Sequence, residues 1–327
     1  LLHQGVAPTP ITDINACEGA TETDPGLVIG RALDPEIDLV VSGHTHYPYI
    51  CTVKDPSGRN RLVTSAYSTG RVVTKLTLRL RQTNGEIVRK KLTAENRIVT
   101  NGDGTQPVQS LLDLIDRYKT LVAPIANKVL GKIAPADTKD TMSRTVDTDG
   151  RDSALGNLIA DSQKADPSSI PSGGTAPVVA FMNPGGIRAD LVENDAKEIT
   201  YGAAFSVQPF NTYIVSMDLT GEQILNVLNE QWNGRNETAY NVLQVSGLTY
   251  TWDVSDATAP ETNAVAGDVM VDLDRDGTAE SKLDPAKVYR VVVNSFLAGG
   301  GDGFPTLAAG KNVYFGGLDI DSLADYL

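Results

Sequence analysis

The alternation of apolar and polar positions predicts a strand-rich region over residues 1–98. The run "GLVIGRALDPEIDLVVSG" predicts the end of a helix followed by a buried strand. Farther along, "RLVTSAYSTGRVVTKLTLRLRQTNGEIVRKKLTAENRIV" alternates apolar with polar residues, which is typical of antiparallel strands. The Asn84-Gly85 dipeptide within it favours a hairpin turn. We therefore expect strands and loops with one short helix, closed by an antiparallel pair.

The period changes over residues 99–133, where apolar side chains recur at helical spacing. These side chains are Val108, Leu111, Leu112, Leu114, Ile115, Tyr118, Leu121 and Val122. Pro107 suits the first turn of a helix, and Pro124 is expected to kink or break it. We expect a long helix that links two domains.

Helical and strand patterns mix over residues 134–327. "SALGNLIADSQKA" and "TGEQILNVLNEQW" predict amphipathic helices, and "APVVAFMNPGGIRADL" predicts a strand that enters a glycine-rich loop. Further strands are predicted from "VLQVSGLTYTWDV", "AVAGDVMVDLD" and "YRVVVNSFLAGGGDGF". The chain therefore predicts an α+β fold with a first domain over 1–98, a linker helix within 99–133 and a second domain over 134–327.

Charge and composition exclude some partners. The 28 Lys and Arg residues are outnumbered by 41 Asp and Glu residues, giving a formal net charge of −13. This balance argues against a nucleic acid polymer as the main partner, but a small anion held by one or two arginines remains compatible with it. No apolar run is long enough to span a bilayer. The opening "LLHQG" does not resemble a natural N-terminus, so we expect a processed form or a fragment, without a leader that identifies the compartment.

The two cysteines are Cys17 and Cys51. They are either two free thiols or a disulfide that closes a loop beside the histidines. Their proximity in so long a chain favours the disulfide, which implies an oxidising compartment.

All three histidines follow strand-like runs near one end of the chain. His44 and His46 stand in "DLVVSGHTH", and His3 stands in "LLHQG". A surface or hydrogen-bonding role is one reading of a His-x-His pair. Neutral imidazoles held at strand ends are also common metal ligands. The neighbouring glycine and the separate His3 favour the metal site.

The segment Asp272–Glu280, "DLDRDGTAE", matches the start of a calcium loop. Carboxylates occupy its positions 1, 3 and 5, and Gly277 occupies position 6. Position 12 is Leu283 rather than Glu, and no helices are predicted on either side. A β-hairpin turn is therefore favoured over a calcium site.

Glycine-rich loops in the second domain carry aromatic and cationic residues. Phe210 and Phe296 stand beside loops, where they either pack in the core or stack on a flat base. Arg188 follows a Gly-Gly pair, where its guanidinium either binds a phosphate or pairs with Asp190 at the surface. These stretches predict a small-molecule site.

"GHTH", with "HQG" upstream, resembles the last two metal-binding motifs of the calcineurin-like metallophosphoesterases. That family hydrolyses phosphate esters with two bridged divalent metals, such as zinc or manganese. The resemblance implies that His3 and His44 bind one metal and His46 the other. The sequence has no counterpart of the family's Asp-x-His motif, bridging Asp or Asn-His pair. We therefore expect an incomplete site, with the catalytic residues upstream of this chain; a single zinc on the three histidines and an empty site are the alternatives.

The stretches "MNPGGIRADL", "SVQPFNTYIVSMDLTGEQI", "LQVSGLTYTWD" and "NSFLAGGGDGF", in this order, resemble the C-terminal domain of 5′-nucleotidases. The resemblance covers nearly the whole chain and implies the remnant of a four-layer α/β sandwich, a linker helix and a nucleotide-binding domain. It implies that Phe210 and Phe296 enclose the base and that Asp302 binds the ribose hydroxyls or lies close to them. It also implies that Asn183 and Gly185 contact the nucleoside, that Arg188 binds the phosphate and that Gly247 backs the base pocket. Arg151 would be a second phosphate ligand, with Arg144 as its rival. Asn211 and Thr212 follow Phe210 where the family often has glycine, so the base preference stays open.

This resemblance implies a secreted, periplasmic or cell-surface phosphohydrolase that removes phosphate from nucleotides. In the family, metal-activated water attacks the phosphate while the C-terminal domain holds the nucleoside. The alternatives are a non-catalytic nucleotide-binding or interaction module, or an enzyme acting on UDP-sugars or 2′,3′-cyclic nucleotides. The oligomeric state does not follow from the sequence.

Overall fold

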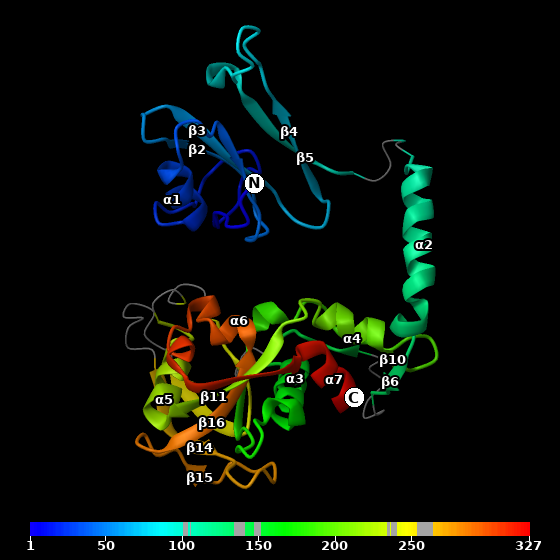
Figure 1. Ribbon diagram of the computed structural model, residues 1–327, viewed down its shortest axis with the longest axis vertical. Helices are drawn as coiled ribbons and strands as arrows, with labels where there is room; N and C mark the ends of the chain where they lie inside the picture. The colour runs from blue at the N-terminus through cyan, green and yellow to red at the C-terminus, as the bar shows by residue number, and fades with distance from the viewer. Residues whose placement is uncertain are drawn as a thin grey trace. The chain divides into compact units, whose positions relative to one another are not determined.

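The protein is described by a computed structural model that covers residues 1–100, 104, 106–133, 141–146, 152–233, 236, 241–253 and 264–327 (Figure 1). Helices and strands both build the chain, which has the expected α+β fold. It divides into two units, Leu1–Leu112 and Asp113–Leu327, which are described separately. Among the described segments, no helix combines the length and hydrophobicity needed to cross a bilayer.

A three-stranded sheet and one helix form the core of the first unit. The strands, in spatial order, are β1 (Leu39–Val41), β3 (Asn60–Ala66) and β2 (Pro48–Lys54). Helix α1 (Pro25–Ala32) packs on this sheet at Gly30, where an added Cβ would lie 2.9 Å from the Val63 side chain. The close approach of helix and sheet therefore depends on a glycine. β1 pairs parallel with β3, and β2 pairs antiparallel with it.

A separate antiparallel pair follows, as the alternating pattern predicts. It consists of β4 (Val72–Thr77) and β5 (Thr93–Ile98). Between them, Gly85 has φ +73° and its N–H donates to the Arg81 carbonyl, which confirms the predicted turn. The short helix η1 (Arg89–Lys91) lies between the turn and β5.

A buried ion network joins η1 to the sheet. Asp55 is buried and accepts a 2.6 Å hydrogen bond from Arg89 Nη1, while Arg89 Nε donates to Asp38 at 2.7 Å. Burial alone would raise the pKa of Asp55, but hydrogen bonds from Ser57 and Arg89 outweigh it and hold that pKa well below its usual range. The carboxylate is therefore charged at neutral pH and fixes the position of the Arg89 side chain.

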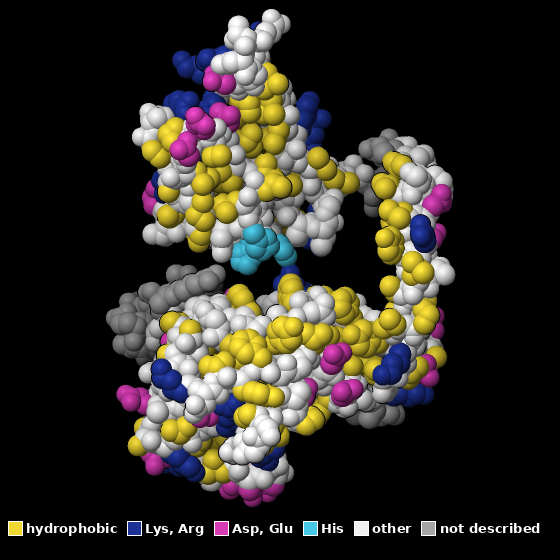
Figure 2. Space-filling view, in the orientation of Figure 1, with side chains coloured by type: hydrophobic (Ala, Val, Ile, Leu, Met, Phe, Trp, Pro, Cys, Tyr) yellow, Lys and Arg dark blue, Asp and Glu magenta, His cyan; other side chains and the backbone are white. Residues whose placement is uncertain are grey.

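A helix, α2 (Gln109–Ala126), lies within the segment where we expect the linker helix. It is shorter than the 99–133 segment, since strand β6 (Val129–Gly131) follows it. Pro124 lies inside its last turn, and the helix ends two residues later. The boundary between the two units falls inside this helix, after Leu112. Its apolar side chains are exposed in this structure (Figure 2).

The second unit is built on a five-stranded sheet. In spatial order its strands are β12 (Gln244–Ser246), β8 (Val179–Met182), β16 (Val288–Asn294), β11 (Tyr213–Thr220) and β17 (Lys311–Leu318). β8 and β16 are parallel, and the other neighbours are antiparallel. A smaller sheet contains β13 (Leu248–Asp253), β14 (Ala264–Val271) and β15 (Ser281–Lys282). Two short pairs are β6 with β10 (Ile199–Thr200) and β7 (Thr141–Met142) with β9 (Leu191–Val192).

Both faces of the five-stranded sheet are buried. In β8, Val179 and Phe181 pack toward α5 (Gly221–Asn229) and the smaller sheet, whereas Ala180 and Met182 pack toward the opposite face. Helices α3 (Ala154–Ala165), α4 (Tyr201–Val207) and α7 (Asp319–Tyr326) cover that opposite face. Burial on both faces explains why β8 is a continuous apolar run rather than an alternating one.

One predicted strand is two strands in the structure. Gly247 separates β12 from β13 with φ +76°, and an added Cβ there would lie 1.9 Å from the Val178 carbonyl oxygen. Only glycine fits this turn, so the chain leaves the large sheet and enters the small one. The Asp272–Glu280 segment connects β14 with β15, which pair antiparallel, and this confirms the predicted hairpin.

Candidate functional site

Three chain segments of the second unit meet at one edge of its large sheet. β8 and β16 are parallel, so the loops after Met182 and Asn294 leave the sheet at the same edge. β11 runs antiparallel to β16 and pairs Ile214 with Asn294, which brings the preceding Phe210 loop to this edge. The strand order therefore collects the two glycine-rich loops and the Phe210 loop that the sequence singles out.

Asn183, Gly185 and Asp302 lie together at this edge. Asn183 is buried, and its Nδ2 donates a 2.7 Å hydrogen bond to Asp302 Oδ2. An added Cβ on Gly185 would lie 3.4 Å from the same Asp302 oxygen. The backbone of the Gly185 loop therefore approaches the carboxylate closely.

Phe296 packs against Gly301, the residue before Asp302. It lies on α6 (Ser295–Ala298), and an added Cβ on Gly301 would lie 2.5 Å from its ring. Asp302 has φ +54°, a left-handed conformation that is uncommon outside glycine. The glycine at position 301 therefore lets the Phe296 ring and the Asp302 turn come into contact.

Arg188 and Phe210 complete the group. The Arg188 guanidinium carbon lies 5.5 Å from the centre of the Phe210 ring, and its Nη1 donates to the Gly185 carbonyl at 3.0 Å. Phe210 is 54% exposed and Phe296 is 44% exposed, so core packing does not account for either ring. Successive contacts therefore run from Phe296 through Asp302 and the Gly185 loop to Phe210.

Arg144 approaches the same loop, whereas Arg151 lies outside the described residues. Arg144 Nη1 donates to the carbonyls of Ile187 at 3.1 Å and Arg188 at 3.0 Å. Arg144 also lines a cavity of about 320 Å³ together with Pro184 and Ile187. A second guanidinium therefore lies beside the Arg188 loop.

Gly247 lies elsewhere in the second unit. β12 runs antiparallel to β8 and pairs Ser246 with Ala180, so Gly247 lies beside the start of β8, whereas Asn183 follows its end. Gly247 lines a different cavity, of about 550 Å³, with Lys164. The structure does not bring it to the loops that carry the two phenylalanines.

Sequence reasoning did not identify two residues that hold this site. Asn294 is buried and caps α6, since its Oδ1 accepts from the Leu297 N–H at 2.9 Å. Asp319 accepts a 2.5 Å hydrogen bond from the Thr212 hydroxyl and donates its own N–H to the Thr212 carbonyl, which anchors the loop after Phe210. Burial raises the pKa of Asp319 despite this hydroxyl contact. A preference for Asn at helix N-caps is the one sequence signal that points to Asn294.

All three histidines of the first unit are exposed (Figure 2). His3 and His44 form a pair, and His46 lies two residues after His44. His44 Nδ1 lies 3.1 Å from His3 Nε2. Both His44 and His46 have left-handed backbones, with φ of 71° and 56°. The loop between them is fixed because the Thr45 hydroxyl donates to the Val6 carbonyl at 2.6 Å. Strained backbone of this kind is concentrated at functional sites.

The His3–His44 pair fits two ligands of one divalent ion. Zinc bonds of about 2.0–2.1 Å in a tetrahedron hold neighbouring nitrogen atoms about 3.3 Å apart, close to the observed separation. In the described part of the chain, ligand atoms of three or more His, Cys, Asp or Glu residues converge within 4.8 Å only at the acidic hairpin loop. His46 therefore does not join the pair as a third converging ligand in this conformation.

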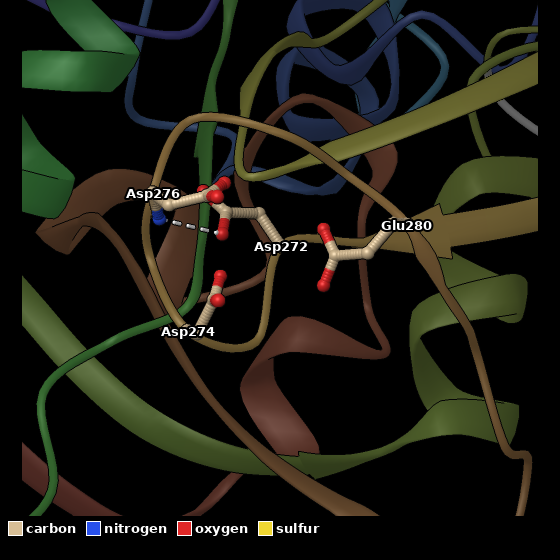
Figure 3. A group of neighbouring side chains, drawn as sticks. All are labelled: Asp272, Asp274, Asp276 and Glu280. Carbon is tan, nitrogen blue, oxygen red and sulfur yellow. Dashed lines mark hydrogen bonds between the residues drawn. The ribbon is translucent and has the colours of Figure 1, made fainter.

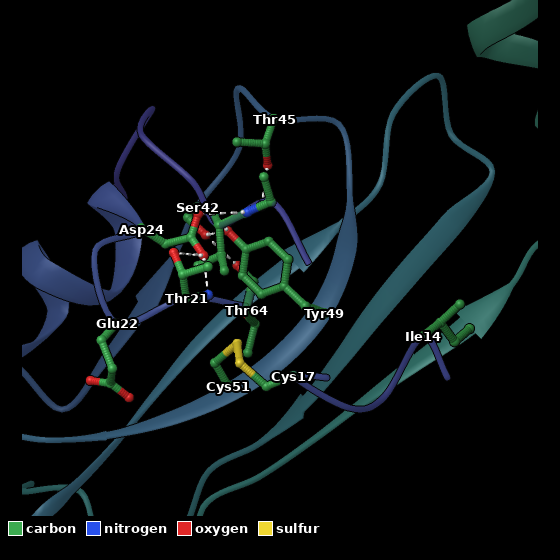
Figure 4. Close-up of a disulfide and its surroundings, with 12 residues drawn as sticks. Ile14, Cys17, Thr21, Glu22, Asp24, Ser42, Thr45, Tyr49, Cys51 and Thr64 are labelled. Atoms are coloured by element: carbon green, nitrogen blue, oxygen red, sulfur yellow. Dashed lines mark hydrogen bonds between the residues drawn. A yellow bond between two sulfur atoms is a disulfide. The ribbon is translucent and has the colours of Figure 1, made fainter. Parts of the chain in front are cut away.

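A disulfide is anchored in β2, the strand that follows the histidine loop (Figure 4). Cys17 and Cys51 are bonded, as the sequence predicts, with their Cα atoms 4.9 Å apart. Tyr49, two residues before Cys51, is buried and forms a 2.6 Å hydrogen bond with the hydroxyl of Ser42. The Val6 N–H donates to the Tyr49 hydroxyl at 3.0 Å, which ties the segment that follows His3 to this strand.

The acidic hairpin loop gathers Asp272, Asp274, Asp276 and Glu280 (Figure 3). This group could hold a metal ion. Asp272 is buried, and its carboxylate already accepts from the N–H groups of Asp276 and Gly277, both at 3.1 Å. Lys164 Nζ lies 3.4 Å from the same carboxylate. These contacts give Asp272 a structural role in closing the hairpin.

Comparison with known proteins matches residues 129–309 to a family model described as the 5′-nucleotidase, C-terminal domain. A cell wall protein of Listeria monocytogenes is 33% identical over 90% of this chain and 36% of its own length. A 5′-nucleotidase-related protein of Glossina morsitans morsitans is 30% identical over 92% of this chain and 55% of its own length. A crystal structure of a 5′-nucleotidase precursor from Thermus thermophilus is 30% identical, with a TM-score of 0.58 over 92% of this chain and 58% of that one. The chain thus spans about half or less of the length of these curated relatives.

Proposed function

The chain belongs to the 5′-nucleotidase family, and from this membership we propose that the unit Asp113–Leu327 binds a nucleotide at the Phe210 and Phe296 loops. The observation that carries the proposal is the unbroken series of contacts from one exposed phenylalanine to the other. Along it lie a carboxylate, a close backbone approach and a guanidinium. These groups match an aromatic base, a ribose and a phosphate in turn.

Each part of the nucleotide has a chemical partner in this series. Exposed aromatic rings stack on bases, with a contribution of about 1–3 kcal/mol per base. The Asp302 carboxylate accepts hydrogen bonds from ribose hydroxyls, and Asn183 holds one of its oxygens. Arg188 binds the phosphate through its planar guanidinium, with Arg144 nearby as a second positive charge.

For the reaction itself, we propose that the family's phosphohydrolase activity depends on two metal ions, one held by His3 and His44 and the other by His46. Such ions would polarise the phosphate and activate a water molecule. The sequence has no fourth histidine and no Asp-x-His motif. We therefore propose that this chain, as given, binds nucleotide and supplies imidazole ligands, but does not complete the hydrolytic site.

We propose a secreted, periplasmic or cell-surface compartment, partly on the basis of the disulfide. Disulfides persist in oxidising environments and are rare in the cytosol. The Cys17–Cys51 bond and the cell wall protein among the relatives support a secreted, periplasmic or cell-surface location.

Replacing Arg188 with alanine is expected to weaken AMP binding about tenfold or more and to leave adenosine binding nearly unchanged. One charge-assisted hydrogen bond contributes about 1.5–3 kcal/mol, and adenosine lacks the phosphate that would receive it. Isothermal titration calorimetry of both ligands on the unmodified chain and on Arg188→Ala measures this difference.

Lys287→Ala is the matched control, because Lys287 also lies over an aromatic ring, 5.6 Å from the centre of Tyr289. We expect it to bind both ligands normally. Equal losses of AMP and adenosine affinity in Arg188→Ala would mean that Arg188 acts only by supporting Phe210. If the unmodified chain bound neither ligand at millimolar concentration, the nucleotide proposal would be wrong.

The histidine pair is tested by zinc affinity. His3→Ala and His44→Ala are each expected to lower zinc affinity more than about tenfold, because each removes one of two converging imidazoles. Competition with a chromophoric chelator measures the affinity. Asp274→Asn in the acidic loop is the control, and we expect it to leave zinc affinity unchanged.

Phosphate release from AMP with added zinc or manganese completes this test. We expect no turnover above background from this chain. Metal-dependent turnover that His3→Ala abolishes would show that the site is complete, and loss of zinc affinity in Asp274→Asn alone would move the metal site to the hairpin.

A further inference from the structure

Asn294 connects the helix that carries Phe296 to the carboxylate of Asp302. It is the last residue of β16 and is only 4% exposed. Its Oδ1 accepts from the backbone N–H of Leu297, and its Nδ2 donates to Asn183 Oδ1 at 2.8 Å. Asn183 Nδ2 in turn donates to Asp302 Oδ2 at 2.7 Å. We call Asn294 and Asn183, in this order, the asparagine relay.

The direction of the relay is set by the backbone of α6. The Leu297 N–H can only donate, so Asn294 must present its oxygen to it and its amide nitrogen to Asn183. Asn183 then presents its own nitrogen to Asp302. A reversed Asn183 amide would set its oxygen against the carboxylate and its nitrogen against the nitrogen of Asn294, which is unfavourable at both ends.

The relay holds Oδ2 of the Asp302 carboxylate. None of the described residues donates to Asp302 Oδ1. The backbone of Asp302 is held separately, because Asn236 Nδ2 and Asn241 Nδ2 donate to its carbonyl at 3.0 and 3.3 Å. The side-chain position and the left-handed backbone of Asp302 are therefore held by different groups.

We propose that Asn294 is a positioning residue that makes the site selective for ribose. Through Asn183 it orients the Asp302 carboxylate to accept hydrogen bonds from the two ribose hydroxyls. The proposal rests on the nucleotide-binding function proposed above. Asn294 itself touches no ligand, so its effect is expected only with ligands that carry the hydroxyls.

Asn294→Asp separates the relay from the helix cap. Aspartate keeps an oxygen for the Leu297 N–H and is as good an N-cap as asparagine. It cannot donate to Asn183, so the Asn183 amide turns and sets its oxygen against Asp302. We expect adenosine affinity to fall about tenfold, the effect of one hydrogen bond to a charged group, and 2′,3′-dideoxyadenosine affinity to stay unchanged.

Two further variants make the result specific. Asn294→Ser keeps a capping hydroxyl, adds no charge and is too short to reach Asn183, so it is expected to lose the same preference for adenosine. Asn312 donates to Asp218 at 2.6 Å at the far end of β11, and Asn312→Asp is the matched control with the same change of chemistry. It is expected to keep the full preference for adenosine. Calorimetry with both nucleosides and thermal melting are measured for every variant.

The outcomes separate this proposal from the one on which it rests. If the unmodified chain binds neither nucleoside, the nucleotide proposal fails and the role of Asn294 fails with it. If the unmodified chain prefers adenosine and both Asn294 variants keep that preference, only the role of Asn294 fails. Equal losses for both nucleosides, with a lower melting temperature, would reduce Asn294 to a structural cap and also overturn the proposal.

Discussion

Replacing Phe210 and Phe296 together with alanine is expected to reduce adenosine affinity about a hundredfold or more. Each stacked ring contributes about 1–3 kcal/mol, and about 1.4 kcal/mol corresponds to a factor of ten. The melting temperature is expected to change little, because the two rings are 54% and 44% exposed. Calorimetry gives the affinity, and thermal melting followed by tryptophan fluorescence gives the stability of the second unit, which contains both tryptophans.

Phe315→Ala is the matched control for this double variant. Phe315 lies on the edge strand β17 and is 60% exposed. Its ring meets the Tyr213 ring edge-on, with the two ring centres 6.3 Å apart. We expect its loss to leave adenosine affinity unchanged, which separates a specific pair of rings from exposed aromatic surface in general. Unchanged affinity in the double variant, together with a melting temperature several degrees lower, would show that both rings are core residues.

The elements with strong local signals could be predicted from the sequence. The Asn84-Gly85 turn needs only its own dipeptide and the alternating residues on either side. Helix α3 (Ala154–Ala165) has a serine N-cap, Ser153, and an apolar face in its own sequence. The end of α2 and the break at Gly247 were less predictable. The break depends on how closely the Val178 carbonyl approaches, which is a tertiary contact.

Some residues of the candidate site could likewise be predicted from local sequence, and others could not. Arg188 and Phe296 stand near glycines in the sequence and Phe210 follows a proline, so their loop positions could be inferred. Asn294 and Asp319 act through contacts with residues far away in the chain, and nothing beside them in the sequence reports those partners. Their roles required the strand order that brings β8, β16 and β11 to one edge.

The spacing of the histidines in the sequence does not determine which of their imidazoles lie together. The sequence places three imidazoles after strand-like runs, and the structure brings His3 and His44 within 3.1 Å of each other. His46 is only two residues from His44, but both backbones are left-handed, and the direction of each ring depends on that conformation. Which imidazoles share an ion therefore cannot be read from a His-x-His motif alone.

Reduction of the Cys17–Cys51 disulfide is expected to destabilise the first unit by about 3–4 kcal/mol, because it releases a long loop in the unfolded chain. The two cysteines are 34 residues apart, and Cys51 is fully buried in the strand that faces α1. Hydrogen exchange of β2 and β3, with and without reductant in increasing urea, measures this change.

The chain contains its own control for this experiment. Both tryptophans, Trp232 and Trp252, lie in the second unit, where their rings are 5.2 Å apart, so their fluorescence reports that unit alone. We expect its urea midpoint to be unchanged by reductant, and we expect a Cys17→Ala, Cys51→Ala variant to be insensitive to reductant in both units. Equal exchange of β2 in oxidised and reduced protein would mean that the core around Tyr49 holds this unit without the disulfide. A shift of the tryptophan transition would mean that the two units unfold together, so that the disulfide of the first unit also stabilises the second.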